Sequence, residues 1–450
     1  MRKVLTLAAV ITGIAAAGMF GYRHAAADSS TAQPAPVVIN TLPNAAPETA
    51  STFGELGPNM PPFVVRPGYR VTLAATHIAN ARFLCFDDHG TLFVSEPRRG
   101  IILALRDQGS DGIYKTQITY ITGMDHVQAM CYVDGWLWFS TSSGPVGNKG
   151  GVYKTQDIDG IKHGPIVTML SGLPSGGSHW FRSLLVTPTG FFTSVGDEHN
   201  FSPDYDPRTD QSDREKIWFY SLDGKTKTLF CTGIRNTERL LYRPGTTELW
   251  GCDEGSDNIG ASLGNSMPNA ITNSIPPERF NHYVQGNFYG HPYINGNGMP
   301  RYEFAEQYLK TGKPDLVAIA NQTTLPAWNL GPHWSTTSYR FLTTDYFPGQ
   351  KGDAIICCHG SWDSSNLVGY RIETVLFDPW TGQPYGNQLI VSTLSADGTE
   401  PLARPVDCIE APDGSIYFSS DFSSHSPDGT SLGNCIFHLT WVGNGGSASH

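Results

Sequence analysis

A histidine and an aspartate lie near the two ends of one short segment, and together they could carry out acid–base chemistry. The segment begins at Gly177 and reads GSHWFRSLLVTPTGFFTSVGDEHN, with His179 near its start and Asp197 near its end. A carboxylate beside an imidazole can fix its tautomer and stabilise the imidazolium that forms when it accepts a proton. The pair is therefore a candidate general base with an orienting carboxylate. A cross-strand ion pair without a catalytic role is the alternative.

Five further basic or imidazole residues hold the same place relative to apolar hairpins elsewhere in the chain. With His179, the set is Arg82, His126, His179, Arg235, His333 and Arg404. If the first strand of each hairpin lies innermost around an axis, these groups meet at one rim. Cations gathered in an acidic protein favour binding of a small polyanion. The alternative is that some of them cap strand ends or pair with surface carboxylates.

The hairpins that carry these groups repeat along the chain. An apolar strand, a turn containing glycine with Asp, Pro or Thr, and a second apolar strand begin near residues 83, 129, 184, 240, 341 and 408. These turn residues supply or fix the φ angles that tight turns need. Most spacings suit a four-stranded propeller blade. We therefore predict an all-β, six-bladed β-propeller over residues 63–442, with a β-sandwich or β-helix as alternatives.

Hairpin pairing also brings the first two residues together. If the turn centres on Pro188 and Thr189, residue 179 lies opposite about residue 198, so Asp197 ends close to His179. The spacing breaks only after Trp250, where an Asn/Pro/Gly-rich stretch runs from 255 to 332. We expect this stretch to form a long loop insertion after the fourth blade.

The N-terminus has the pattern of an export signal. Residues 1–27 contain a basic start, an apolar run and three alanines, typical of a signal peptide, with an uncleaved membrane anchor as the alternative. We expect 28–62 to be a flexible Ala/Pro/Thr-rich tether and 443–450 a disordered tail. The protein is thus expected to be exported, in the periplasm or on a membrane facing it.

Composition and cysteine spacing exclude several function classes. The net charge is −11, and removing residues 1–27 with Arg2, Lys3 and Arg23 makes it −14, so general attraction for nucleic acid is not expected. The chain lacks C-x-x-C-H for haem attachment and a strand-to-helix G-x-G-x-x-G for NAD. Its eight cysteines stand mostly in apolar strand contexts, which favours buried free thiols, with one or two disulfides open.

Several segments, in this order, resemble the glucose/sorbosone dehydrogenase family of quinoprotein propellers, which use pyrroloquinoline quinone (PQQ) and calcium. They are GLPSGGSHWFRSLL, GIRNTERLLYRPGTTELWGCDEGSDNIG, NHYVQGNFYGHPY, FPGQKGDAIICCHGSWDSSNLVGYR and ARPVDCIEAPDGSIYFSSD. The sorbosone dehydrogenase branch is the most similar through HGSW and YGHPY. The resemblance implies oxidation of a sugar or sugar-derived aldehyde, with hydride transfer to PQQ and electrons passing to an external quinone or cytochrome.

The resemblance also implies roles for individual residues. His179 stands where the family has the base that takes the substrate hydroxyl proton, and Asp197 where an aspartate orients it. The cofactor-binding residues would be Arg82, His126, Arg235, Asn236, His359, Trp362 and Arg404. Calcium would be held by main-chain carbonyls of Gly255 and Ser256, with Asp257 or Asp253 as a carboxylate alternative. After HGSW the family often has asparagine and arginine, whereas this chain has Asp363 and Ser364.

Two other functions remain open at the level of sequence. One is a propeller that binds a small anion or a protein partner without redox chemistry, which the missing arginine after HGSW favours. The other is a metal-dependent sugar lactonase, for which the DEGSDN segment is the candidate ligand cluster.

Overall fold

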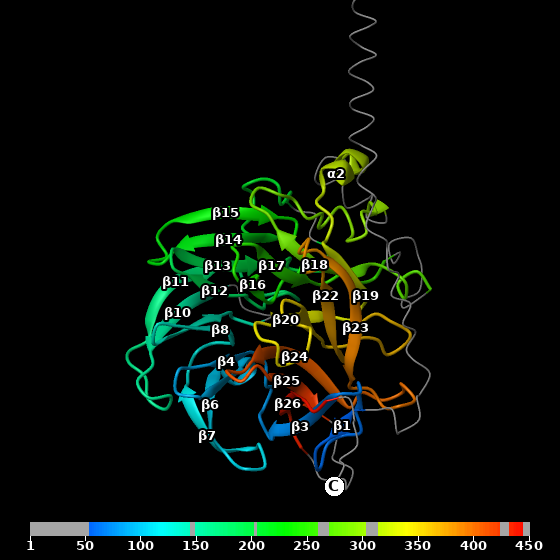
Figure 1. The fold of residues 1–450 in the computed structure, drawn as a ribbon. Helices are drawn as coiled ribbons and strands as arrows, with labels where there is room; N and C mark the ends of the chain where they lie inside the picture. Colours follow the sequence, from blue (N-terminus) through cyan, green and yellow to red (C-terminus); the bar gives the residue numbers. More distant parts are fainter. Residues whose placement is uncertain are drawn as a thin grey trace, which may run out of the picture. The chain divides into compact units, whose positions relative to one another are not determined.

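The computed structural model describes residues 54–144, 149–201, 205–259, 270–302, 314–423 and 432–443. Contacts divide the chain into Met1–Thr41 and Leu42–His450, and all described residues belong to the second unit. Their strands form six sheets of four or five strands each, which confirms the six-bladed β-propeller (Figure 1). The expected signal peptide, most of the tether and nearly all of the C-terminal tail lie outside the described residues.

The first three blades each contain four consecutive strands. Blade one consists of β4 (Leu84–Phe86), β5 (Leu92–Glu96), β6 (Ile101–Gln108) and β7 (Tyr114–Ile121). Blade two consists of β8 (Val127–Val133), β9 (Trp136–Thr141), β10 (Gly150–Gln156) and β11 (Val167–Leu173). Blade three consists of β12 (Leu185–Thr187), β13 (Gly190–Val195), β14 (Lys216–Ser221) and β15 (Lys227–Thr232).

Blade four again contains four consecutive strands, whereas blades five and six include strands from the N-terminal part of the unit. Blade four consists of β16 (Leu240–Tyr242), β17 (Leu249–Asp253), β18 (Pro277–Tyr283) and β19 (Trp328–Pro332). Blade five consists of β20 (Thr336–Phe341), β21 (Ala354–Cys358), β22 (Arg371–Phe377), β23 (Pro384–Ser392) and β2 (Val64–Val65). Blade six consists of β24 (Ala403–Glu410), β25 (Ile416–Ser423), β26 (Cys435–Trp441), β3 (Tyr69–Ala75) and β1 (Glu55–Leu56).

The first two strands of every blade are the hairpins recognised in the sequence. In blade three, Thr187 pairs with Gly190, so the turn lies at Pro188 and Thr189 as predicted. The turn glycines Gly90 and Gly135 have φ of 78° and 76°, the left-handed region that glycine enters without a Cβ penalty. First strands of neighbouring blades contact one another, as β4 and β8 do, so they are innermost.

The ring is closed by the N-terminal part of the unit. Strand β3 pairs antiparallel with β26, so the sixth sheet contains both ends of the propeller. Strand β1 pairs with β3, and Met60 and Phe63 are buried in the core between blades five and six. The predicted tether over 28–62 is therefore too long at its C-terminal end, because residues from 54 onward already pack into the propeller.

Apolar side chains pack mainly between adjacent blades. Six clusters of buried residues each join two neighbouring sheets, as faces of a sheet must be covered. The adjacent Cys357 and Cys358 point into different clusters, as alternation along a strand requires. All eight cysteines are free, which confirms the expectation of buried thiols.

The long insertion belongs to the interior of blade four rather than to a loop after it. Residues 255–332 contain β18 and β19, so the prediction of an uninterrupted loop was wrong. Its Asn, Pro and Gly content masked two outer strands, of which β19 is the edge strand of the sheet, where such residues are tolerated. The helix α2 (Leu316–Gln322) also lies in this stretch.

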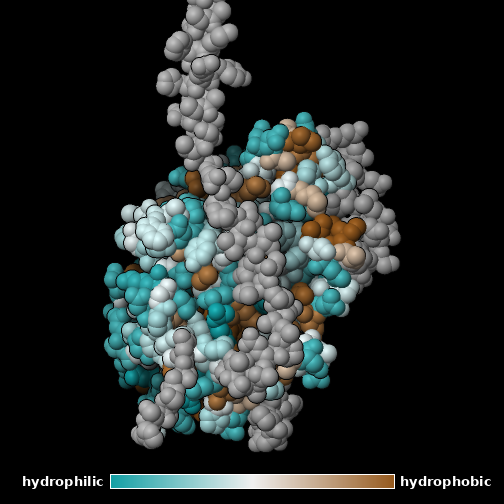
Figure 2. All heavy atoms as spheres, turned by 45° about the vertical axis from the view of Figure 1, so that its right-hand side comes forward, coloured by the Kyte–Doolittle hydropathy of each residue, from teal (hydrophilic) through white to brown (hydrophobic). Residues whose placement is uncertain are grey.

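The surface is polar over most of the face drawn in Figure 2, where hydrophobic residues form small separate patches. Isolated exposed apolar residues are normal for a folded protein. Within the described ranges, none of the helices is both long and apolar enough to cross a bilayer.

Candidate active site

Several of the positions that precede first strands are joined by one network of charged side chains. Arg82 donates to Glu238 Oε2 and to Asp421 Oδ2, both at 2.9 Å, and its guanidinium lies 4.1 Å from the ring centre of Phe181. His359 shares the Asp421 carboxylate, with 2.8 Å between Nε2 and Oδ1. These contacts connect blades one, four, five and six.

Arg404 approaches the same place from blade six. Its Nε donates to the main-chain oxygen of His359 at 3.2 Å, and Nη2 donates to that of Gly360 at 3.3 Å. The positive charge of Arg404 also helps to lower the pKa of Asp421, together with the nearer His359 and Arg82, although burial acts in the opposite direction. The structure thus brings Arg82, His359 and Arg404 together.

Arg235 and Asn236 begin blade four in a fixed backbone geometry. Their amides donate to Asp253 Oδ1 at 3.0 and 2.7 Å, and Arg279 pairs with the other side of that carboxylate. The Asn236 side chain donates to Glu254 Oε2 at 2.8 Å. Asp253, an alternative calcium ligand in the sequence, is therefore committed to positioning these two residues.

Asp257 links blade four to blade five. Its Oδ2 accepts from Arg235 Nη2 at 2.7 Å, and its Oδ1 lies 3.5 Å from His333 Nδ1. Although burial acts to raise the pKa of Asp257, these two partners lower it. His333 Nε2 donates to the carbonyl of Thr272 at 2.6 Å, and the Asp257 contact raises the pKa of His333 against the effect of burial.

The predicted calcium segment lies beside this pair. The amide of Gly255 donates to Glu278 Oε2 at 2.9 Å, and Ser256 is buried. Asp257 and His333 form a group with Asp363 in which potential ligand atoms lie within 4.8 Å of one another. Asp363, noted in the sequence as a departure from the family pattern, thus adds a carboxylate next to the expected metal position.

His179 is buried near Arg235, with its Nδ1 3.1 Å from the main-chain oxygen of Asp197. A carbonyl oxygen only accepts hydrogen bonds, so Nδ1 carries the proton and Nε2 is left as the basic nitrogen. The prediction that the Asp197 carboxylate orients His179 was wrong, because the carboxylate does not face the His179 ring. Side chains alternate along an extended chain, so the carbonyl faces His179 while the carboxylate contacts His291 Nε2 at 2.8 Å.

The surroundings keep His179 uncharged. Burial lowers its pKa to about 3, and the nearby Arg235 acts in the same direction. The negative charges of Asp197 and Asp257 oppose this shift without cancelling it. A neutral imidazole with a fixed tautomer is the form that accepts a proton, so the geometry suits a general base.

Two buried carboxyl groups of the network hold protons near neutral pH. Burial, which outweighs the contact with Arg82, raises the pKa of Glu238 to about 7. Burial and the neighbouring Glu254 raise the pKa of Glu278 to about 8. The site is therefore a mixed acidic and basic cluster instead of the purely basic ring expected from the sequence.

Two predicted cofactor-binding residues have other surroundings. His126 pairs with the adjacent Asp125 and packs against Trp180, with ring centres 5.0 Å apart. It also lines a shallow surface depression of about 250 Å³ with Arg98 and Arg99. Trp362 is 74% exposed. Neither residue is brought into the charged network by its contacts.

The sequence analysis missed the acids that balance the cations. Glu238 stands three residues after Arg235, Glu254 directly follows a second hairpin strand, and Asp421 lies among the last three residues of another. Asp197 follows a second strand in the same way, so a search for carboxylates at this position of each repeat would have found them. His291 and Glu215 had no such signal, because neither lies in a hairpin.

The network fits PQQ, a tricarboxylate, only if a divalent cation binds with it. Three guanidinium groups face five carboxyl groups, two of which hold protons near neutral pH, so the network has no surplus of positive charge and a tricarboxylate needs added positive charge. The guanidinium groups belong to Arg82, Arg235 and Arg404. The carboxyl groups belong to Glu238, Glu254, Asp257, Glu278 and Asp421.

Donors and ligands for both groups are present. The Nε atoms of Arg82 and Arg235 are buried and have no hydrogen-bond acceptor among the described residues, so each can serve a ligand oxygen. The oxygens of Asp257, Glu254 and Glu278 are of the kind that calcium prefers. The residues therefore fit PQQ and calcium as a pair.

Comparison with known proteins agrees with the fold and the resemblance. The calcium structure of a Trichoderma reesei carbohydrate-active enzyme of family AA12 has a TM-score of 0.65 and 21% identity, covering 85% of this chain and 98% of that one. The holo form of the pyranose dehydrogenase PQQ domain from Coprinopsis cinerea has a TM-score of 0.66 and 17% identity, covering 86% and 98%.

Two further matches are more distant or partial. The apo form of the soluble aldose sugar dehydrogenase from Escherichia coli has a TM-score of 0.59 and 14% identity, covering 83% and 100%. An uncharacterized protein of Borreliella burgdorferi is 26% identical over 233 residues, 51% of this chain and 54% of that protein. The chain thus spans about half the length of this curated relative.

A family model covers most of the propeller. The model described as TrAA12-like matches residues 63–426, which include every strand from β2 to β25 and the whole charged network. Together with the quinoprotein domains among the matched structures, this confirms the resemblance seen in the sequence. The chain belongs to the TrAA12-like family.

Proposed function

We propose that the protein is a PQQ- and calcium-dependent dehydrogenase that oxidises a sugar or a sugar-derived aldehyde such as sorbosone or an aldose. The observation that carries the proposal is His179, a buried neutral imidazole with a defined basic nitrogen beside Arg235. Membership of the TrAA12-like family supports it, as do the sugar and PQQ named for the matched structures.

The cofactor would be held by residues from several blades. Arg82, Arg235 and Arg404 would face its carboxylate and quinone oxygens, with Asn236 and His359 beside them. Calcium would bind to the carbonyls of Gly255 and Ser256 and to carboxylates of the Asp257 and Glu278 region. We do not assign His126 or Trp362 to the cofactor, since neither contacts the network.

PQQ, when bound with calcium, would accept a hydride from the substrate carbon. His179 Nε2 would take the proton from the substrate hydroxyl, which for an aldehyde is a hydroxyl of its hydrate. The imidazolium formed would be stabilised by the negative charges of Asp197 and Asp257, the same groups that raise its pKa against burial. The hydrogen bond to the Asp197 carbonyl would keep the ring oriented through this change.

Electron transfer and location complete the proposal. The chain has no haem attachment motif, so reducing equivalents would leave to a separate quinone or cytochrome. We further propose that the protein is exported and works in the periplasm or at a membrane facing it, on the basis of the N-terminal sequence.

The proposal is tested by reconstitution. Purified protein is titrated with PQQ in the presence of calcium, and sugars and aldehydes are then supplied with an artificial electron acceptor. We expect saturable PQQ binding and acceptor reduction with at least one aldose or aldehyde. His179→Ala should bind PQQ but lose turnover by about 10²–10⁴-fold, whereas His89→Ala, at an exposed histidine, should behave as the wild type.

Other outcomes would assign the rival functions. PQQ binding without reduction by any sugar would indicate a binding propeller, and failure to bind PQQ with calcium present would remove the quinoprotein proposal. Lactone hydrolysis that requires calcium but not PQQ would indicate the lactonase.

A further inference from the structure

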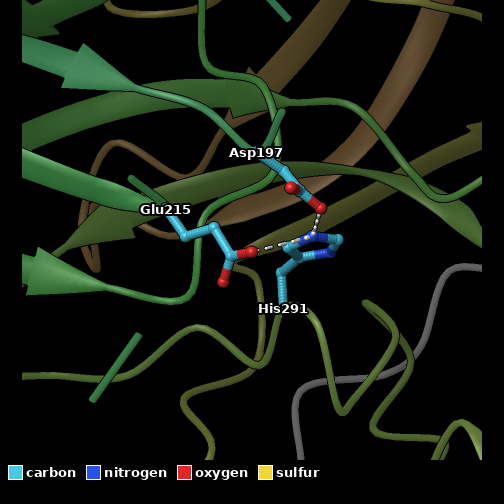
Figure 3. A group of neighbouring side chains, drawn as sticks. All are labelled: Asp197, Glu215 and His291. Atoms are coloured by element: carbon cyan, nitrogen blue, oxygen red, sulfur yellow. Dashed lines mark hydrogen bonds and ion pairs between the residues drawn. The ribbon is translucent and has the colours of Figure 1, made fainter. Parts of the chain in front are cut away.

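Two carboxyl groups and an imidazole meet next to His179, outside the charged network. Asp197 follows β13, Glu215 immediately precedes β14, and His291 lies in the loop after β18. Figure 3 shows both carboxylates directed at the same imidazole nitrogen. His291 Nε2 lies 2.8 Å from Asp197 Oδ2 and 3.7 Å from Glu215 Oε1.

The three side chains are withdrawn from solvent. Asp197 and Glu215 are fully buried, and His291 is 2% exposed. Tyr205 is a hydrogen-bonding neighbour of the Glu215 carboxyl. A carboxylate buried this deeply is costly unless a proton or a cation compensates for its charge.

The distances between the side chains suit a shared metal ion. For an ion about 2.1 Å from each ligand atom, separations of 2.8 and 3.7 Å correspond to ligand–metal–ligand angles of about 85° and about 125°. All three potential ligand atoms lie within 4.8 Å of one another. Both angles fall in the range of tetrahedral to octahedral coordination.

We propose that Asp197, Glu215 and His291 form a binding site for a divalent transition-metal ion of the Zn²⁺ or Mn²⁺ class. One imidazole and two carboxylates favour these ions over calcium, which prefers oxygen ligands alone. The site is separate from the expected calcium position beside Gly255 and Ser256, and it does not depend on the proposed dehydrogenase function.

The protonation states of the ligands support such a site. Burial lowers the pKa of His291 to about 4, so the ring is neutral and able to ligate at physiological pH. Burial, and then the charge of Asp197, raise the pKa of Glu215 well above its ordinary value.

The ion would have a structural role with a consequence for the candidate base. Its ligands come from blade three and from the loop after β18, so it would fasten that loop to blade three. It would also hold the residue whose main-chain carbonyl contacts His179 Nδ1. Because the site is enclosed, the ion should be taken up during folding and should exchange slowly.

The test is the metal content of the full-length protein. The protein is produced in media supplemented separately with Zn²⁺, Mn²⁺ or Co²⁺, dialysed against a chelator and measured by elemental mass spectrometry. We expect about one equivalent of one of these metals in the wild type and at least a tenfold decrease in His291→Gln and Glu215→Gln. His438→Gln, at a half-buried histidine in blade six, and Asp363→Asn, in the other ligand group, should keep the metal.

A spectroscopic measurement on the wild type covers the case in which the variants do not fold. X-ray absorption at the edge of the bound metal should show one imidazole with oxygen ligands and no sulfur. Folded wild type without any of the three metals would overturn the proposal, as would metal retained by both His291→Gln and Glu215→Gln or a sulfur ligand. None of these readouts depends on PQQ or turnover, so they are distinct from a failure of the dehydrogenase proposal.

Discussion

The protonation state of His179 provides a quantitative prediction. An ordinary histidine with a pKa of about 6.5 is about 3% neutral at pH 5. Burial and Arg235 lower the pKa of His179 to about 3, which leaves about 99% neutral at that pH. The population of the base should therefore hardly change between pH 7 and pH 5, whereas an ordinary imidazole would lose about 25-fold.

Histidine-selective NMR measures this directly. The ring nitrogens of ¹⁵N-histidine-labelled protein are followed from pH 8 to pH 4.5, and the His179 signals are identified by their absence in His179→Gln. We expect the neutral tautomer with the proton on Nδ1 throughout the range, because the Asp197 carbonyl only accepts. In Arg235→Met the pKa should rise, since the second cause of the shift is removed.

The result that would refute this reasoning is a His179 titration with a midpoint near 6.5. A proton on Nε2 in place of Nδ1 would contradict the assigned base in a different way, because the basic nitrogen would then face the Asp197 carbonyl. Kinetic pH profiles are less direct, because Glu238 and Glu278 have pKa values of about 7 and about 8 and titrate in the same range.

Three further predictions concern the charged network and stability. Arg82→Leu should lower the free energy of unfolding by about 3–5 kcal/mol in denaturant titrations, because Glu238 and Asp421 lose a buried partner. Removing calcium with a chelator should weaken PQQ binding tenfold or more, about 1.4 kcal/mol or more, in absorbance titrations. Between pH 6.5 and pH 4, His179 and His438 should each lower the free energy of unfolding as the pH falls, because their folded-state pKa values of about 3 and about 4 lie below that of an unfolded histidine. The raised pKa values of Glu238 and Glu278 act in the opposite direction.

Each of these has its own control. Arg98→Leu, at an exposed arginine, should leave stability unchanged, and equal effects of the two arginine variants would contradict the buried network. Calcium added back should restore PQQ affinity, and calcium-independent affinity would contradict the charge argument. His438→Gln should lose less stability than the wild type when the pH falls from 6.5 to 4, since in the wild type the unfolded chain takes up the His438 proton first.

The repeat made the propeller predictable from sequence. Hairpins with glycine turns specify the two inner strands of each blade, because these are short, apolar and joined locally. Outer strands are less regular, so β18 and β19 were read as loop. The closing strand β3 was also missed, since its partner β26 lies more than 350 residues away and no local pattern encodes that pairing.

The sequence predicted the positions of site residues where the repeat fixes them. It did not predict which group of a residue points at its neighbour. The repeat identified four basic residues because each one stands before or at the start of the first strand of its blade: Arg82, Arg235, His333 and Arg404. Asp197 was placed near His179 correctly, but sequence spacing does not show whether a carbonyl or a carboxylate faces the ring. His291 lies in the YGHPY segment that carries part of the resemblance, but its contact with Asp197 was not predicted because a loop outside the repeat places it there.

The central claim is that His179 acts as the base in oxidation of a sugar or aldehyde with PQQ. Anaerobic single-turnover mixing of PQQ- and calcium-loaded protein with substrate tests it most directly, by following the absorbance of the bound quinone. The account predicts rapid reduction in the wild type and a rate about 10²–10⁴-fold lower in His179→Gln, with PQQ affinity little changed. Reduction of both proteins at the same rate, or of neither by any sugar or aldehyde, would contradict it.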